Sequence, residues 1–124
     1  MYQLTSSLYP CHEYYRQYLL PNRFNDRNLN AIRQRLYPFY PLRYTLCSEY
    51  LVPFLCSVVV PMYNLGKRPA CRSSCEKVFR ECSYARRRLN FLWPREWRCS
   101  QFTERSCFSK CNNDCTWSFD YSWC

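Results

Sequence analysis

Cysteine is the residue type most able to do chemistry in this chain of 124 residues, which contains 11 of them. Cys71, Cys75 and Cys82 are spaced at i, i+4 and i+11, so a helix would carry all three on one face. Val78 and Leu89 fall on the same face. Thiols on the inner face of a helix can crosslink it to other segments. The spacing therefore predicts a helix that disulfides join to the rest of the domain.

Disulfides are the state that we expect for most of these cysteines. A short chain so rich in cysteine is typical of a disulfide scaffold, and such bridges persist in oxidising compartments. Because the number of cysteines is odd, at least one is free or pairs outside this chain. The segment from Met1 to Ser7 shows no basic stretch followed by an apolar run. No signal peptide is therefore visible, while the cysteines favour an extracellular location.

Zinc is the alternative use of the thiols. Two Cys-x-x-x-Cys pairs, Cys71 with Cys75 and Cys111 with Cys115, could supply four thiolates to a tetrahedral zinc ion in an intracellular domain. That arrangement gives the other cysteines no role. We therefore expect neither a metal site nor a cofactor.

The chain shows no constellation that is typical of an enzyme. A cysteine nucleophile needs a histidine base, and the single histidine, His12, follows Cys11, which we expect to be oxidised. The acidic residues are scattered, and the sequence contains neither a glycine-rich phosphate loop nor a serine nucleophile motif. We therefore expect a binding or structural protein rather than an enzyme.

The formal charge of +9 suggests a polyanionic partner such as heparan sulfate. Arg86, Arg87 and Arg88 form the densest basic cluster, but successive helical residues diverge by about 100°, so they cannot form one flat strip. The alternative is a solvated helix face. Nucleic acid is not expected in an oxidising compartment. No apolar run reaches the roughly 18 residues that span a bilayer, so we expect no membrane span.

The elements that must position these residues are mainly helical. We expect an extended segment over residues 1–23, followed by a helix that Asn25 can cap and that Pro38 and Pro41 end. Hydrophobic periodicity predicts a second helix over about 48–60.

A third helix is expected over about 70–89, where the regular cysteine spacing lies. From Cys99 onward the chain is polar and cysteine-dense, which is typical of crosslinked loops. The sequence therefore predicts a mainly α, small disulfide-rich helical domain with a short extended N-terminal segment and a loop-rich tail.

Several motifs resemble the frizzled-type cysteine-rich domain, and they occur in the same order and at nearly the same spacing. They are, each with the family's pattern, residues 20–25 (LPNRFN; M-P-N-x-F-N), 39–42 (FYPL; F-x-P-L), 54–57 (FLCS; F-F-L-C-S), 71–76 (CRSSCE; C-R-x-x-C-E) and 90–94 (NFLWP; G-F-x-W-P). The resemblance covers residues 9–107, which we expect to form the domain. Residues 108–124 would form a cysteine-rich tail or the start of another module.

The resemblance implies a specific disulfide pattern. The family's first cysteine has no counterpart before Cys11, and Tyr63 occupies the position of its partner. Both ends of one bridge are thus absent together, which agrees with the alignment. Cys111, Cys115 and Cys124 lie beyond the pattern. The pairs carried over are Cys11–Cys56, Cys47–Cys82, Cys75–Cys99 and Cys71–Cys107.

The resemblance also implies a ligand. In the frizzled family this domain binds Wnt proteins, and an apolar groove between helices holds the ligand's acyl chain. A Smoothened-like branch holds a sterol in a similar place, and a free fatty acid would have the same chemistry. The domain would belong to a secreted protein or to the ectodomain of a plasma-membrane receptor. The alternative is a structural or adhesion module that docks polyanions.

Six residues carry the implied ligand contacts. Arg23, Phe24 and Val59 take the groove positions, Val58 and Met62 are close to them in sequence, and Trp93 belongs to a motif near a second, loop-formed contact. For each residue the alternative is ordinary core packing.

Overall fold

Helices form most of the regular structure of the domain. The computed structural model describes residues 2–3, 11, 17–61 and 70–104. In chain order the elements are β1 (Tyr2–Gln3), β2 (Gln17–Tyr18), α1 (Leu29–Leu36), the 3-10 helix η3 (Tyr37–Phe39), α2 (Tyr40–Arg43), α3 (Leu51–Val59), α4 (Arg72–Glu81), α5 (Ser83–Leu89) and the 3-10 helices η5 (Arg95–Trp97) and η6 (Cys99–Gln101). The fold is thus the small, disulfide-rich, mainly α domain that the sequence predicts.

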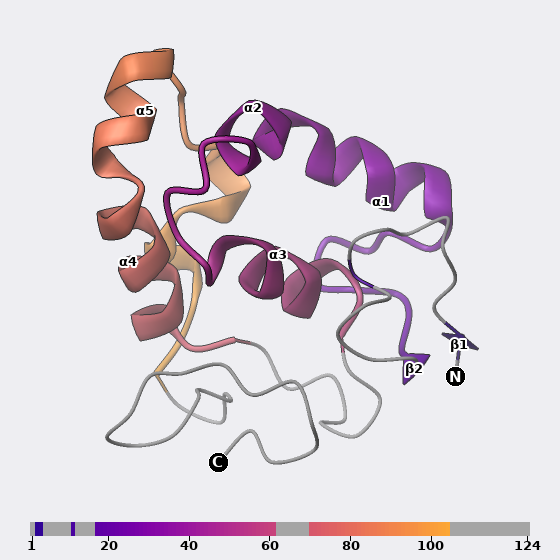
Figure 1. Cartoon of the computed structure of the whole chain (residues 1–124). Helices are drawn as coiled ribbons and strands as arrows, with labels where there is room; N and C mark the ends of the chain where they lie inside the picture. The colour runs from indigo at the N-terminus through magenta and orange to yellow at the C-terminus, as the bar shows by residue number, and fades with distance from the viewer. Residues whose placement is uncertain (1, 4–10, 12–16, 62–69, 105–124) are drawn as a thin grey trace.

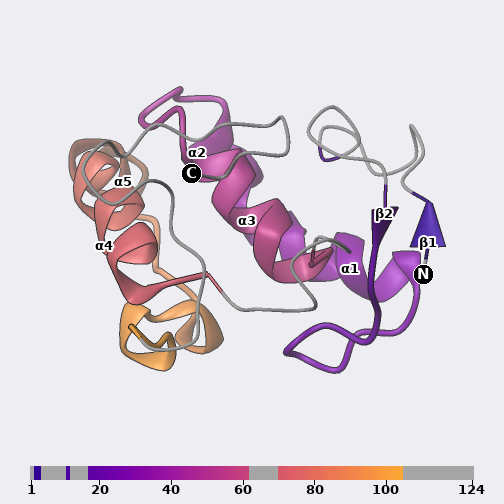
Figure 2. The ribbon, with the colours of Figure 1, turned by 90° about the horizontal axis from the view of Figure 1, so that it is seen from below.

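The helices are arranged around α3. Figure 1 shows α1 and α2 in one layer above α3, with α4 and α5 stacked as a column beside them. Viewed from below, α3 crosses in front of this layer, and the short turns after α5 lie next to α4 (Figure 2). β1 and β2 pair antiparallel, with Tyr2 opposite Tyr18. The extended N-terminal segment is therefore observed at these two strands, and the rest of it lies outside the described residues.

α3 is the central helix because it is apolar on nearly all sides. Eight of its nine residues are buried, Val52 being the exception, and a helix that is hydrophobic all round belongs in a core. Trp97 comes from the other end of the domain and is fully buried beside it. Its ring lies 5.1 Å from that of Phe39 and 6.1 Å from that of Phe54. An aromatic core thus joins α3 to η3 and η5.

The first helix begins later than the sequence predicts, and further helical turns follow it. Asn28, rather than Asn25, caps α1 by accepting a hydrogen bond from the backbone N–H of Ala31. Asn25 instead has a left-handed conformation with φ 64°. α1 ends at Leu36, ahead of Pro38, and both prolines lie within the short helices that follow. Each lies in the first turn of the next short helix, η3 or α2, where the missing N–H has no helical partner to lose.

The third predicted helix is two helices. The chain breaks at Cys82, which has φ −93° and ψ 11° and separates α4 from α5. Cys75, Val78 and Cys82 are buried on the inner face as predicted. Leu89, the last residue of α5, does not join them and is 42% exposed. Asn90, in a left-handed conformation, ends α5.

Three disulfides are observed among the described residues: Cys11–Cys56, Cys47–Cys82 and Cys75–Cys99. They are three of the four pairs that the resemblance implies. Cys71 is also disulfide-bonded, but its partner is not among the described residues, so the pair Cys71–Cys107 stays a prediction. The tail over residues 108–124 also lies outside them. Within the described ranges, no helix is long and apolar enough to span a bilayer.

Candidate functional site

A small apolar hollow lies between the α1–α2 layer and α3. Its cavity volume is about 20 Å³, far below the roughly 300–1,000 Å³ that is usual for ligand pockets. Half-buried side chains at its edge include Leu36, Tyr40 and Val52. The lining consists of Cys11, Leu36, Phe39, Tyr40, Arg43, Val52, Leu55 and Cys56.

The chemistry of this hollow is that of a hydrocarbon site. Phe39, Leu55 and the Cys11–Cys56 disulfide are buried at its inner side. Arg43 is the one charged residue in the lining, and its guanidinium lies 5.6 Å from the ring centre of Tyr44. The hollow can therefore bury an apolar group, and it offers no pair of groups that could transfer a proton.

Phe24 occupies a different place, above the aromatic core. Its ring lies 5.2 Å from that of Trp97 and is half-buried. The guanidinium of Arg35 lies 4.5 Å from the centre of the Phe24 ring. Arg35 is held there by an ion pair of 3.0 Å with the buried Asp26, and this hydrogen bond raises the pKa of Arg35. The Phe24 ring therefore packs between Trp97 of the core and the guanidinium of Arg35.

Arg23 is exposed and ties its loop to the segment around η6. Its guanidinium donates a hydrogen bond of 2.6 Å to the backbone carbonyl of Gln101. It also lies 4.2 Å from the centre of the Phe102 ring, which is cation–π distance. Partial burial of the guanidinium lowers the pKa of Arg23.

The two valines predicted for the groove are core residues. Val58 is 4% exposed and Val59 is completely buried. The backbone carbonyl of Val59 accepts a hydrogen bond from the side-chain amide of the buried Asn22. In this structure the two side chains contribute to packing and do not reach a surface. Met62 lies outside the described residues.

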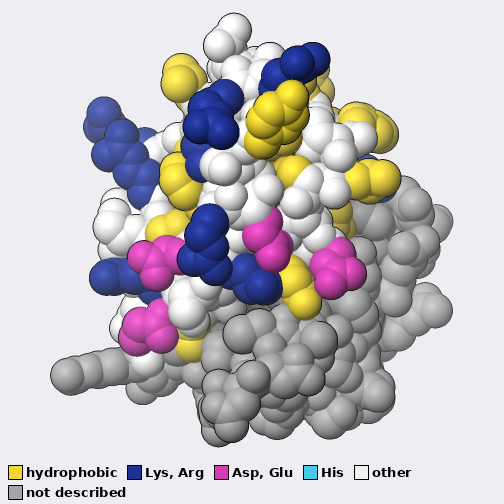
Figure 3. All heavy atoms as spheres, turned by 60° about the vertical axis from the view of Figure 1, so that its left-hand side comes forward, with side chains coloured by type: hydrophobic (Ala, Val, Ile, Leu, Met, Phe, Trp, Pro, Cys, Tyr) yellow, Lys and Arg dark blue, Asp and Glu magenta, His cyan; other side chains and the backbone are white. Residues whose placement is uncertain are grey.

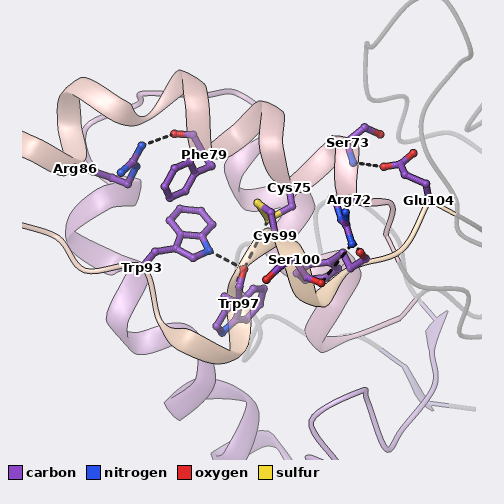
Figure 4. The surroundings of a disulfide bond; sticks show 11 residues. Arg72, Ser73, Cys75, Phe79, Arg86, Trp93, Trp97, Cys99, Ser100 and Glu104 are labelled. Atoms are coloured by element: carbon purple, nitrogen blue, oxygen red, sulfur yellow. Dashed lines mark hydrogen bonds between the residues drawn. A yellow bond between two sulfur atoms is a disulfide. The ribbon is translucent and has the colours of Figure 1, made fainter.

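Trp93 is an anchor of the segment after α5. Its indole nitrogen donates a hydrogen bond to the backbone carbonyl of Trp97, as Figure 4 shows. Its ring makes edge contacts with Phe39 and Phe79, at centre distances of 5.3 and 5.1 Å. The next side chain towards α5, Leu92, is 87% exposed. Phe24 and Trp93 therefore both contact Trp97, while Val58 and Val59 lie within α3.

The residues that line the hollow could not be identified from the sequence, because no pattern distinguishes them from closely packed core residues. Leu36 and Leu55 lie on the predicted apolar faces of two helices, as ordinary core residues do. Whether two such faces close on each other depends on how the helices are placed. Tyr40 and Val52 carried no signal beyond hydrophobic character.

Metal binding finds no support in the described part of the chain. No group of three or more histidine, cysteine, aspartate or glutamate side chains there could hold an ion. The seven described cysteines are all disulfide-bonded and do not offer thiolates.

The sequence matches that of known proteins. The family model of the Fz domain matches residues 4–106. Frizzled-5 of Danio rerio is 32% identical over 110 residues, which cover 82% of this chain and 19% of that protein. Frizzled-1 of Xenopus laevis is 32% identical over 90 residues, which cover 71% of this chain and 16% of that protein. The chain spans less than a fifth of the length of either relative. On this match and on its disulfide-bonded helical fold, the chain belongs to the Fz domain family.

Proposed function

We propose that the chain is an extracellular ligand-binding domain that recognises a lipid-modified, Wnt-like protein. It acts by binding rather than by catalysis, as part of a receptor ectodomain or a secreted protein. The proposal follows from membership of the Fz family and from the disulfides, which persist in oxidising surroundings.

The apolar hollow beside α3 is the observation that supports this function best. A lipid-modified protein exposes an acyl chain that water disfavours, and each buried methylene contributes about 0.8 kcal/mol. About a dozen methylenes along the hollow and its exposed edge would contribute up to about 10 kcal/mol before the costs of ordering the partners and of widening the hollow. Few polar contacts would then be needed, in keeping with a lining in which Arg43 is the one charged residue.

The residues carried over from the family make a second part of the proposal. Phe24 and Arg23, on the side of Trp97, would form the alternative groove for the acyl chain. A separate protein contact would lie near Trp93, where Leu92 offers an exposed apolar side chain.

The test is binding of a fluorescent unsaturated fatty acid, and then of acylated Wnt protein, to the purified oxidised chain. Val52→Glu places a carboxylate in the hollow, and Phe24→Glu places one at the groove implied by the family. Leu89→Glu is the matched control, because it makes the same kind of change on α5.

We expect saturable binding that Val52→Glu weakens at least about tenfold, since an acyl chain would have to displace water from the carboxylate, at a cost above the 1.4 kcal/mol this requires. Loss in Phe24→Glu alone would move the lipid site to the family position. Displacement of the fatty acid by a sterol would reassign the ligand. Absence of any saturable binding to either probe would refute the proposed function.

A further inference from the structure

Charge is unevenly distributed on the face of the molecule formed by α4 and α5. Figure 3 shows acidic and basic side chains together in the middle of this face, and basic and hydrophobic side chains without acidic ones towards its upper end. Between Ser83 and Arg95 the sequence contains four arginines and no aspartate or glutamate. The end of the column at α5 therefore has a positive surface with no counter-charge of its own.

Helix geometry places part of this charge on one side of α5. Residues that follow each other by three or four positions share a helix face, so Tyr84 lies beside Arg87 and Arg88 on α5, while Ala85 is the buried residue of this helix. Arg80 lies in the last turn of α4, before the break at Cys82. Arg80, Tyr84 and Arg87 are all exposed, Tyr84 at 65%. Arg88 is exposed beside them, and its guanidinium lies 5.9 Å from the centre of the Tyr84 ring. We call Arg80, Tyr84, Arg87 and Arg88 the α5 face.

Arg86 does not belong to the α5 face. Its guanidinium lies 3.6 Å from the centre of the Phe79 ring and donates a hydrogen bond to the backbone carbonyl of Phe79 (Figure 4). Burial, followed by the charge of Arg87, lowers the pKa of Arg86. The three consecutive arginines therefore divide, with one directed inward onto an aromatic ring and two directed outward into solvent.

The arginines of the α5 face are not neutralised by the described protein. The ion pairs found among the described residues involve Arg35 and Lys77. Cations in the last turn of a helix interact favourably with its carbonyl end, which accounts for basic residues at 86–88. The same interaction accounts for Arg80 in the last turn of α4, but not for an exposed tyrosine between the cations.

We propose that the α5 face binds a sulfated polysaccharide. Arginine forms paired, charge-assisted hydrogen bonds with oxyanions, and the three exposed arginines offer several such donors to a chain with repeated sulfate groups. The disulfides indicate an oxidising environment, where sulfated sugars, rather than nucleic acid, are the polyanions available. The α5 face lies on the outer side of the α4–α5 column and does not share a residue with the apolar hollow. This inference therefore goes beyond the proposed function and is independent of it.

The experiment measures binding of the oxidised chain to immobilised heparin and to dextran sulfate, with neutral dextran as the uncharged probe. Arg87→Glu/Arg88→Glu reverses the charge of the α5 face. Arg27→Glu/Arg98→Glu is the matched control, because it removes the same charge from exposed positions away from α5. Circular dichroism of each variant reports whether the helical domain remains folded.

The wild type and the control are expected to bind the sulfated probes alike, and the α5 variant at least about tenfold more weakly. Binding should fall as salt rises from about 0.1 M to about 1 M, because the screening length shortens from about 10 Å to about 3 Å. Equal weakening of both variants would show that total charge alone is responsible and would overturn the proposal. Tighter, α5-dependent binding to phosphatidylserine vesicles than to dextran sulfate would overturn it in favour of a lipid surface.

Discussion

The indole nitrogen of Trp93 donates a hydrogen bond to the backbone carbonyl of Trp97 over 2.7 Å, and the two residues lie on either side of the turn that begins η5. The bond closes this turn while the Trp97 ring fills the core. Trp93 therefore holds the segment after α5 against the rest of the domain, whatever its part in ligand contact.

Trp93→Phe separates the hydrogen bond from the ring packing. A phenyl ring keeps contacts with Phe39 and Phe79 but leaves the Trp97 carbonyl without this donor. We expect the free energy of unfolding to fall by about 1–2 kcal/mol, and by about 3–5 kcal/mol in Trp93→Ala. Urea unfolding of the oxidised chain measures both. Equal losses in the two variants would contradict a separate role for the bond.

Asn28→Ala tests which asparagine caps α1. Loss of the bond to the Ala31 N–H should reduce the free energy of unfolding by about 1 kcal/mol. Asn25→Gly should leave it unchanged or raise it, because glycine adopts a positive φ without steric cost. Thermal unfolding followed by circular dichroism compares the two, and the reverse order of effects would assign the cap to Asn25.

Arg35→Met removes the cation that lies between Asp26 and the Phe24 ring. Asp26 is 5% exposed. In this variant its carboxylate would lose the bonds from Arg35 and keep the one from the Asn22 side-chain amide. A buried carboxylate that loses a charged partner is costly, so we expect a loss of about 2–4 kcal/mol. The double variant Arg35→Met/Asp26→Leu should recover part of it. Failure of the second change to restore any stability in urea would argue against the ion pair as the cause.

The disulfides give a quantitative prediction from loop length. Cys47 and Cys82 are 35 positions apart, and Cys75 and Cys99 are 24 positions apart. Restriction of the unfolded chain then contributes about 3–4 kcal/mol to the stability for each disulfide. The bridge that closes the longer loop contributes a few tenths of a kcal/mol more. Replacing both cysteines of one pair by alanine and measuring urea unfolding checks this. Stability within about 1 kcal/mol of the wild type would show that chain restriction is not the main contribution.

The crosslinked helical fold could be predicted from sequence because its signals are local or belong to the family. The spacing of Cys75, Val78 and Cys82 identifies a buried face without any tertiary information. The break at Cys82 could not be predicted, since cysteine has no strong helix-breaking tendency. Its backbone departs from helical geometry at the residue that Cys47 crosslinks. Asn25 and Asn28 are equally good caps by type, and only their φ angles distinguish them.

The candidate site was harder to predict from the sequence, because it depends on how closely the helices pack and on where their side chains point rather than on residue types. Val59 is a typical core residue and is fully buried, as any valine in an apolar helix could be. Leu55, four positions earlier, contributes to the wall of the hollow. The two residues share a face of α3, so the difference arises from what packs against each turn along that face, and hydrophobic periodicity does not carry that information.

Only Ala85 among the seven residues of α5 is buried, while Cys82 before it is covalently fixed and Asn90 after it ends the helix. The ends of α5 are therefore defined by other residues, and its outward side chains can change without removing core contacts. Related domains could diversify its outward residues through evolution, or a protein engineer could graft a new recognition surface there, with little disturbance of the interior that makes the domain fold.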